Sequence, residues 1–119
     1  MKVVVTSTGP DLDSQLDERY GRASYLLSVD TESMEFAAHD NSANMKAMQG
    51  AGVSTSQSVM DMEPDAVITG SLGPKAFAVM QNTGIPSYSA KGVTCREAVQ
   101  MLLEDKLQRI DNAGGNKKW

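Results

Sequence analysis

The chain has little of what several functional classes require. A single cysteine among 119 residues excludes an internal disulfide and a structural zinc site built on several thiolates. There is also only one histidine, which makes a nucleophile–base pair hard to assemble. Lysine and arginine number 11 against 15 acidic residues, for a net charge of -4. This balance argues against nucleic-acid binding, which usually needs a basic face.

Long apolar runs are missing as well. No run approaches membrane-spanning length, and Val3–Val5 is too short for the core of a signal peptide. We therefore expect no membrane association and a cytoplasmic location. With 40% hydrophobic residues, the length suits one domain with a real core. Eight methionines against 5% aromatics indicate flexible core filling, with soft metal ligation as the alternative.

The most informative segment is the turn that follows a short β-branched run. Val67–Thr69 suits a buried strand. Gly70 and Gly73 permit a tight turn, and Pro74 suits the first position of a helix. Such a junction aims backbone N–H groups at one point and can bind an anion. An ordinary strand–helix connection is the alternative. The glycine pattern matches neither a P-loop nor a dinucleotide fingerprint.

Hydrophobic periodicity and turn residues predict five strands and about three helices in an α/β layered domain. The predicted strands are Lys2–Ser7, Tyr25–Val29, Met34–His39, Val67–Thr69 and Ile85–Ser89, with Pro86 suiting an edge position. The predicted helices are Met45–Met62, Pro74–Asn82, and one capped by Thr94 that carries Val99, Leu102, Leu103, Leu107 and Ile110 toward the sheet. The second and third strands form a hairpin, so the sheet is mixed. Residues 1–110 would form the domain and residues 111–119 a mobile tail.

Ligands in such sheets sit outside the carboxyl ends of the parallel strands. Three loops should meet there: Thr8–Arg22, Asn41–Gly52 and Gly70–Pro74. The turn Ala90–Gly92 is a fourth candidate.

Two features of these loops favour an anionic ligand. Arg19 and Arg22 flank Tyr20-Gly21, and the planar fork of arginine suits anions. A local ion pair with Asp17 or Glu18 is an equally good interpretation. The glycines Gly50 and Gly52 cost a helix about 1 kcal/mol each relative to alanine, which suggests a packing or ligand reason.

The remaining reactive side chains are better explained as structural. His39 ends a predicted strand, where an isolated histidine is more often structural than catalytic. Cys95 lies in the first turn of a helix, which can lower a thiol pKa, but its phase with Val99 favours a buried, inert thiol. The acidic loop around Asp11 lacks calcium-loop spacing and reads as solvated.

Taken together, these segments resemble the dinitrogenase iron–molybdenum cofactor biosynthesis family (NifX- and NafY-like proteins and their small single-domain relatives). The resemblance covers nearly the whole chain to about Leu103, and its segments stand in family order. They are Asp11–Ser14, Glu18–Ala23, Gly50–Gly52, Val67–Phe77 and Gly92–Ala98.

The resemblance implies a ribonuclease-H-like fold and a non-enzymatic role in binding or carrying molybdenum-containing metal–sulfur clusters. In small members the cargo would be a mixed molybdenum–copper sulfide cluster held noncovalently. The iron–molybdenum cofactor or a precursor is the alternative cargo, and proteins of a cluster-handling complex are the expected partners. The residues expected to bind the cluster are Arg19, Tyr20, Gly21, Arg22, Met48, Gln49, Gly50, Gly52, Gly70, Ser71, Gly73 and Pro74.

One departure concerns the position before Gly50. Family members often carry histidine there as a candidate metal ligand, whereas this chain has Gln49 beside Met48. Met48 and Cys95 are then the candidate metal ligands. The substitution also motivates a second hypothesis, a metal-free regulatory or interaction module. A third, an enzyme acting on a phosphate-containing molecule, lacks a visible catalytic base.

Overall fold

The computed structural model describes residues 1–46 and 50–113. The strands are β1 (Lys2–Ser7), β2 (Tyr25–Asp30), β3 (Phe36–Asp40), β4 (Ala66–Thr69), β5 (Ser87–Ser89) and β6 (Gln108–Arg109). The helices are α1 (Ser42–Met45), α2 (Ala51–Met62), α3 (Pro74–Thr83) and α4 (Cys95–Leu103). The described part of the chain thus has six strands and four helices, one more of each than the sequence predicted.

The sheet is mixed, as predicted. Its strand order is β3-β2-β1-β4-β5-β6. The strands β1, β4 and β5 run parallel, whereas β2 and β3 form the predicted antiparallel hairpin on one side. On the other side β6 pairs antiparallel with β5. The carboxyl ends of the three parallel strands therefore lie at one edge.

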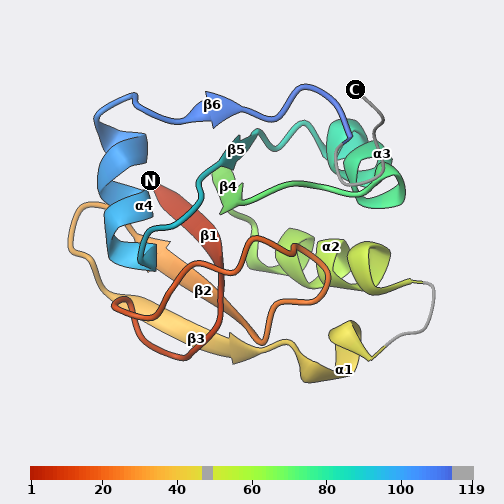
Figure 1. Cartoon of the computed structure of the whole chain (residues 1–119), viewed down its shortest axis with the longest axis horizontal. Coiled ribbons are helices and arrows are strands. Elements are labelled where there is room, and N and C mark those ends of the chain that lie inside the picture. Colours follow the sequence, from red (N-terminus) through yellow and green to blue (C-terminus); the bar gives the residue numbers. More distant parts are fainter. Residues whose placement is uncertain (47–49, 114–119) are drawn as a thin grey trace.

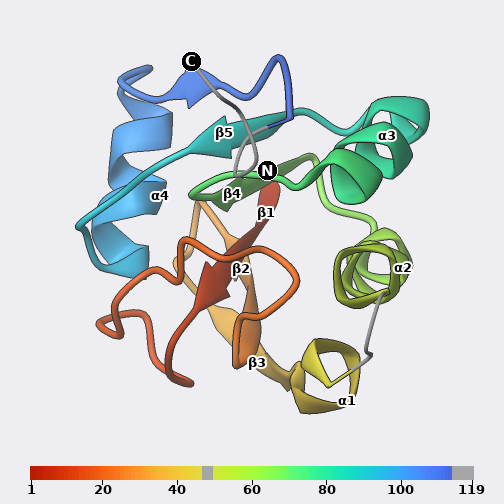
Figure 2. The ribbon, with the colours of Figure 1, turned by 45° about the vertical axis from the view of Figure 1, so that its right-hand side comes forward.

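Helices cover both faces of the sheet. Figures 1 and 2 show α4 on one face and α1, α2 and α3 on the other. The side chains of β1 alternate between the two layers: Val3 and Val5 pack in the cluster that includes α4, and Val4 packs in the cluster that includes α2 and α3. A strand buried on both faces needs apolar residues at every position, which accounts for the run at Val3–Val5.

Of the helix expected over Met45–Met62, the described structure has α2, and a separate short helix, α1, occupies Ser42–Met45, where a loop was expected. The first, α1, ends at Met45, and α2 begins at Ala51 with Gly50 as its N-cap. The sequence interpretation had placed Gly50 inside a helix, but its backbone (φ -125°, ψ 17°) is outside the helical range. Thr55 and Val59 are buried at the predicted helical spacing.

Two amide side chains, the buried Asn41 and the partly buried Asn44, hold α1 against α2. The Asn41 Nδ2 donates to the Ala23 carbonyl at 2.9 Å and to Thr55 Oγ1 at 3.2 Å. The Asn44 Nδ2 donates to Ser58 Oγ at 2.9 Å. These tertiary bonds have no local sequence signature, so the break between α1 and α2 was missed.

The last predicted helix is also shorter than expected. The capping box at its start is present, with Thr94 and Glu97 bonded reciprocally. The helix α4 ends at Leu103 because Asp105 adopts the left-handed conformation (φ 59°). The N–H groups of Asp105 and Lys106 donate back to the carbonyls of Leu102 and Met101, which is a Schellman termination. Aspartate at that position is a weaker sequence signal than glycine.

The chain after α4 returns along the sheet as β6. Leu107 and Ile110 therefore flank a strand and do not extend a helical face, as had been expected. This strand covers β5, so β5 is not the edge strand that Pro86 had suggested. Pro86 is tolerated because β5 begins one residue later, at Ser87. The Pro86 carbonyl still accepts a hydrogen bond from the Val67 N–H at 3.0 Å.

Within the described ranges, the helices are all too short or too polar to cross a membrane.

Candidate functional site

Three segments meet at the carboxyl edge of the parallel strands and border an open cavity of about 540 Å³. They come from the loop before β2, the start of α2 and the start of α3, so the predicted convergence of three loops is what the structure has. The described residues that line this large cavity are Glu18, Arg19, Tyr20, Gly21, Arg22, Ala51, Gly52, Ser71, Gly73, Pro74, Lys75 and Ala76.

Close backbone contacts fix these segments to one another. A Cβ on Gly21 would lie 2.6 Å from the Gly52 nitrogen, and one on Gly52 would lie 3.0 Å from the Cβ of Ala76. Real Cβ atoms do not approach backbone atoms so closely. Glycine at 21 is therefore required by the packing of the loop on α2, and glycine at 52 lets α2 approach α3.

The two glycines of the β4–α3 turn have different roles. A Cβ on Gly70 would lie 2.4 Å from the Glu18 Cβ and 2.6 Å from its backbone oxygen. Gly70 thus holds the turn against the first loop, and the Ser71 N–H donates to the Glu18 carbonyl at 3.3 Å. Gly73 has open space where a Cβ would be. It is the N-cap of α3 and lines the cavity.

Both helices that border the cavity present their N-termini to it. Neither N-cap, Gly50 for α2 or Gly73 for α3, supplies a side-chain hydrogen bond to the helix. The first N–H groups of a helix have no intrahelical acceptor, and the helix dipole places partial positive charge there. Pro74 at the first position of α3 confirms the predicted helix start. The arrangement can bind an anion through backbone donors.

Arg19 is held in place by a buried carboxylate. Its Nε donates to Asp17 Oδ1 at 3.1 Å and its Nη2 to Asp17 Oδ2 at 3.0 Å. Asp17 is 4% exposed and Arg19 is 69% exposed. The hydrogen bonds and the charge of Asp17 raise the pKa of Arg19. The local ion pair weighed as an alternative does form, and most of the Arg19 side chain remains exposed where it lines the cavity.

The other cationic groups of the cavity come from Arg22 and Lys75. The Arg22 Nη1 donates to the carbonyl of Met45, the last residue of α1, at 2.9 Å. Lys75 is the second residue of α3 and is exposed. Glu18 is the one acidic residue among the described lining residues. Its Oε2 accepts from the Gly92 N–H at 3.2 Å, which ties the Ala90–Gly92 turn to the site.

Tyr20 contributes to the cavity wall, but its ring lies in the core and is 3% exposed. Its hydroxyl is 2.9 Å from Ser56 Oγ on α2. Burial raises the pKa of Tyr20 to about 12. The phenol is therefore neutral near pH 7. Its contact with Ser56 positions the loop before β2 on α2.

Comparison with known proteins supplies the family. The model of the dinitrogenase iron-molybdenum cofactor family matches residues 1–105. The chain belongs to this family. An uncharacterized protein of Methanocaldococcus jannaschii is 27% identical over 101 residues, which are 83% of this chain and 86% of that protein.

Several solved structures share the fold. The apo form of the orange protein from Desulfovibrio gigas is 33% identical, with a TM-score of 0.92 and 96% of both chains covered. A putative NifB protein from Thermotoga is 27% identical, with a TM-score of 0.84 and 98% of both chains covered. A putative dinitrogenase from Methanocaldococcus jannaschii, 18% identical with a TM-score of 0.69 over 94% of this chain and 96% of that one, shows the same fold. The family resemblance predicted from the motifs is confirmed.

Not every expected residue of this family member lies at the large cavity. Cys95 is fully buried in the α4 layer, with its Sγ 4.0 Å from the Thr6 carbonyl, and burial raises its pKa. His39 is exposed on the outermost strand β3, next to Leu26 in the α2 layer. The two side chains belong to opposite faces of the sheet, so a Cys–His dyad does not form. Met48 and Gln49 lie outside the described residues.

Two carboxylates in the acidic loop of this family member form ion pairs. Asp13 bonds Arg96 at 2.9 Å, which lowers the pKa of that carboxyl, and Asp17 bonds Arg19. Among residues 1–46 and 50–113, no group of three or more His, Cys, Asp or Glu side chains could hold a metal ion.

Sequence reasoning missed four lining residues, Glu18, Ala51, Lys75 and Ala76. The signal that could have found Ala51, Lys75 and Ala76 is position: each falls in the first turn of a helix whose start faces the site. Asp17 was considered only as an ion-pair partner. Nothing local marks it as the buried support of Arg19.

Proposed function

We propose that this protein binds or carries an anionic molybdenum-containing metal–sulfur cluster, without catalysing a reaction. The cargo we favour is a mixed molybdenum–copper sulfide cluster, held noncovalently in the large cavity. The observation that carries the proposal is the convergence of two uncapped helix N-termini with Arg19, Arg22 and Lys75 on one cavity. Membership of the iron-molybdenum cofactor family supports the class of cargo.

The chemistry of the lining residues fits an anion better than a bare metal ion. The described lining residues include no cysteine, histidine or methionine. They offer backbone N–H groups, guanidinium groups and the apolar surfaces of Ala51, Pro74 and Ala76. A cluster whose charge is spread over sulfides would accept hydrogen bonds from these donors and pack on the apolar surfaces. The volume of about 540 Å³ is far larger than a single ion needs.

Two expectations from the resemblance belong to the same proposal. The iron–molybdenum cofactor or a precursor is the alternative cargo, and proteins of a cytoplasmic cluster-handling complex are the proposed partners. The strand order β3-β2-β1-β4-β5, with only the β1, β4 and β5 strands parallel, supports the ribonuclease-H-like classification of the fold.

The test is metal retention. The protein is incubated with tetrathiomolybdate and a copper(I) salt and then desalted. Its visible spectrum and metal content are then measured. We expect retained charge-transfer bands with molybdenum and copper in a fixed ratio. An Arg19→Ala, Arg22→Ala double variant should lose most of the bound metal, because two of the cations at the cavity are gone.

The matched control is Arg96→Ala, Lys106→Ala, which removes the same charge. Both of these cations bond acidic side chains, Asp13 and Glu104, away from the cavity. The proposal is wrong if wild-type protein emerges colourless and metal-free. If both double variants lost the same amount of bound metal, Arg19 and Arg22 would contribute only through the net charge of the protein.

The alternative function is a metal-free regulatory or interaction module. It is favoured by Gln49 at the position where the family often has histidine. In that case the protein should capture its partner from a lysate equally well after chelation of metals, and the partner should protect the cavity residues from amide exchange.

A further inference from the structure

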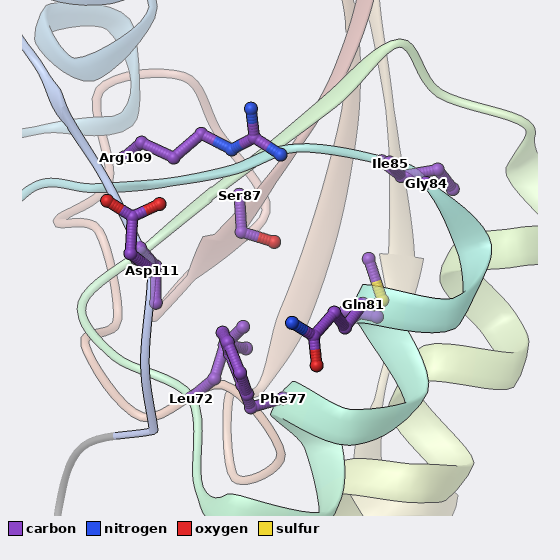
Figure 3. A pocket seen from close by; sticks show the side chains of 10 residues that line it. Leu72, Phe77, Gln81, Gly84, Ile85, Ser87, Arg109 and Asp111 are labelled. Atoms are coloured by element: carbon purple, nitrogen blue, oxygen red, sulfur yellow. The ribbon is translucent and has the colours of Figure 1, made fainter.

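A second, smaller cavity lies along α3 toward its C-terminal end, apart from the candidate cluster site. Its volume is about 110 Å³. Figure 3 shows side chains around it from the β4–α3 turn, from α3, from β5, from β6 and from the segment after β6. Leu72, Phe77, Met80 and Ile85 form apolar walls, and Gln81, Ser87, Arg109 and Asp111 supply polar groups.

The floor of the small cavity holds a buried hydroxyl without a partner. Ser87 is 5% exposed, and its Oγ is the one buried side-chain polar atom in the described part of the chain that makes no hydrogen bond. The backbone of Ser87 is paired, because its carbonyl accepts from the Ile110 N–H at 2.8 Å. Figure 3 shows the hydroxyl pointing into the cavity, with the Gln81 amide on the opposite wall. A buried hydroxyl left unbonded is costly, so something should occupy the cavity and bond to it.

The rim carries one charge of each sign. Arg109 and Asp111 are exposed and lie two residues apart on a segment bonded to β5. Residues two apart in extended chain are separated by about 7 Å. No ion pair joins the two in the described structure. A molecule with a carboxylate at one end and an ammonium at the other could bridge them.

The volume limits the size of the occupant. A water takes about 30 Å³, and an apolar cavity of about 150 Å³ accepts benzene. A cavity of about 110 Å³ therefore accepts roughly four to six non-hydrogen atoms, and its open mouth leaves charged ends at the rim.

We propose that this cavity is a binding site for a small zwitterion, an α-amino acid with little or no side chain such as glycine or alanine. The carboxylate accepts hydrogen bonds from the Arg109 guanidinium and from the Ser87 hydroxyl. The ammonium faces the Asp111 carboxylate. The methyl group of alanine packs on Leu72 and Ile85. The site is separate from the candidate cluster cavity and independent of the function proposed for it.

The test is a titration of the full chain followed by amide chemical shifts. Glycine and L-alanine should perturb residues around Ser87 with a dissociation constant on the order of 1 mM. Acetate and methylammonium, which each lack one charge, should bind at least about tenfold more weakly. L-Tryptophan should not bind, because its side chain exceeds the volume.

Two variants assign the contacts. Ser87→Ala and Arg109→Gln should each weaken alanine binding by about tenfold, whereas Arg96→Gln, at an exposed ion pair on α4, should leave it unchanged. Ser87→Ala removes an unbonded oxygen, so it should fold, and an unchanged spectrum elsewhere verifies this. The proposal is overturned if wild type shows no perturbation at this cavity up to roughly 50 mM ligand, which would leave ordered water as the occupant. It is equally overturned if Ser87→Ala and wild type bind alike.

Discussion

The two cavities of this protein lie on the same side of the sheet, at opposite ends of α3, and are built from different materials. The large cavity at the start of α3 is bordered by two helix N-termini, held by glycine contacts and lined by three cationic residues. The small cavity near its end is made of individual side chains, one of them an unbonded hydroxyl. Backbone donors and diffuse positive charge suit a large anion with spread charge. Localised groups of both signs suit a small molecule that carries both.

The largest effect should come from the glycine that locks the large cavity. Gly70→Ala places a Cβ 2.4 Å from the Cβ of Glu18, so the first loop must move. We expect a loss of about 3 kcal/mol in the free energy of unfolding and loss of metal retention. Gly73→Ala is the matched control, since it meets no atom within 4 Å and should change stability by less than about 1 kcal/mol. Urea unfolding measures the free energy of unfolding of both variants. Equal losses would mean that the contact between Gly70 and Glu18 does not fix the turn.

The next effect concerns the support of Arg19. Asp17→Asn keeps the shape of the buried side chain but removes its charge, and should cost about 1 to 2 kcal/mol of unfolding free energy. It should also weaken metal retention, because Arg19 loses its orientation. Asp13→Asn is the control: Asp13 is 75% exposed and pairs with Arg96, so its loss should be too small to resolve. Urea unfolding and metal analysis of both variants decide whether Asp17 positions the cavity.

A smaller effect, of opposite sign at two buried serines, should distinguish a bonded from an unbonded hydroxyl. Ser56 Oγ donates to the Gly52 carbonyl at 2.9 Å and lies 2.9 Å from the Tyr20 hydroxyl. Ser56→Ala should therefore lower the unfolding free energy by about 1 kcal/mol, whereas Ser87→Ala should raise it by about 1 kcal/mol without ligand. Thermal unfolding in amino-acid-free buffer measures both. A loss of stability in Ser87→Ala would show that its hydroxyl is already bonded, for instance to water.

The smallest effect should come from the only cysteine. Cys95 is buried in the α4 layer and its pKa is raised by burial, so the thiol should stay protonated and inaccessible near neutral pH. We expect Cys95→Ala to retain as much molybdenum and copper as wild type. The native thiol should react with a disulfide reagent only after denaturant is added. Metal loss in this variant would mean that a thiolate ligates the cluster, which would contradict noncovalent binding in the large cavity.

Much of the fold was predictable because its signals are local. Val3–Val5 marked a strand buried on both faces, Thr94 and Glu97 marked a capping box, and Pro74 marked a helix start. The misses share a cause in long-range contacts. The break before α2 is supported by bonds from Asn41 and Asn44, and β6 exists because β5 offers it a free edge.

The candidate site was predictable in part for the same reason. Arg22 and Gly73 stand in motifs that can be read locally. Tyr20, by contrast, was expected to face ligand, and its ring is in the core. Sequence spacing says which residues share a loop, but the packing of that loop decides which of its side chains point inward.

By itself, the sequence determined the α/β class, the mixed sheet, the family and the meeting of three loops at one edge, because apolar strand patterns, glycine turns and family motifs can be read locally. Tertiary structure alone decided that Asp17 holds Arg19, that Cys95 is out of reach of the cavity, and that Ser87 is left without a partner. The burial of Asp17, Cys95 and Ser87 depends on how segments far apart in the sequence pack, as with Thr6 and Cys95, which are 89 residues apart. Such distances are fixed only when the whole core packs.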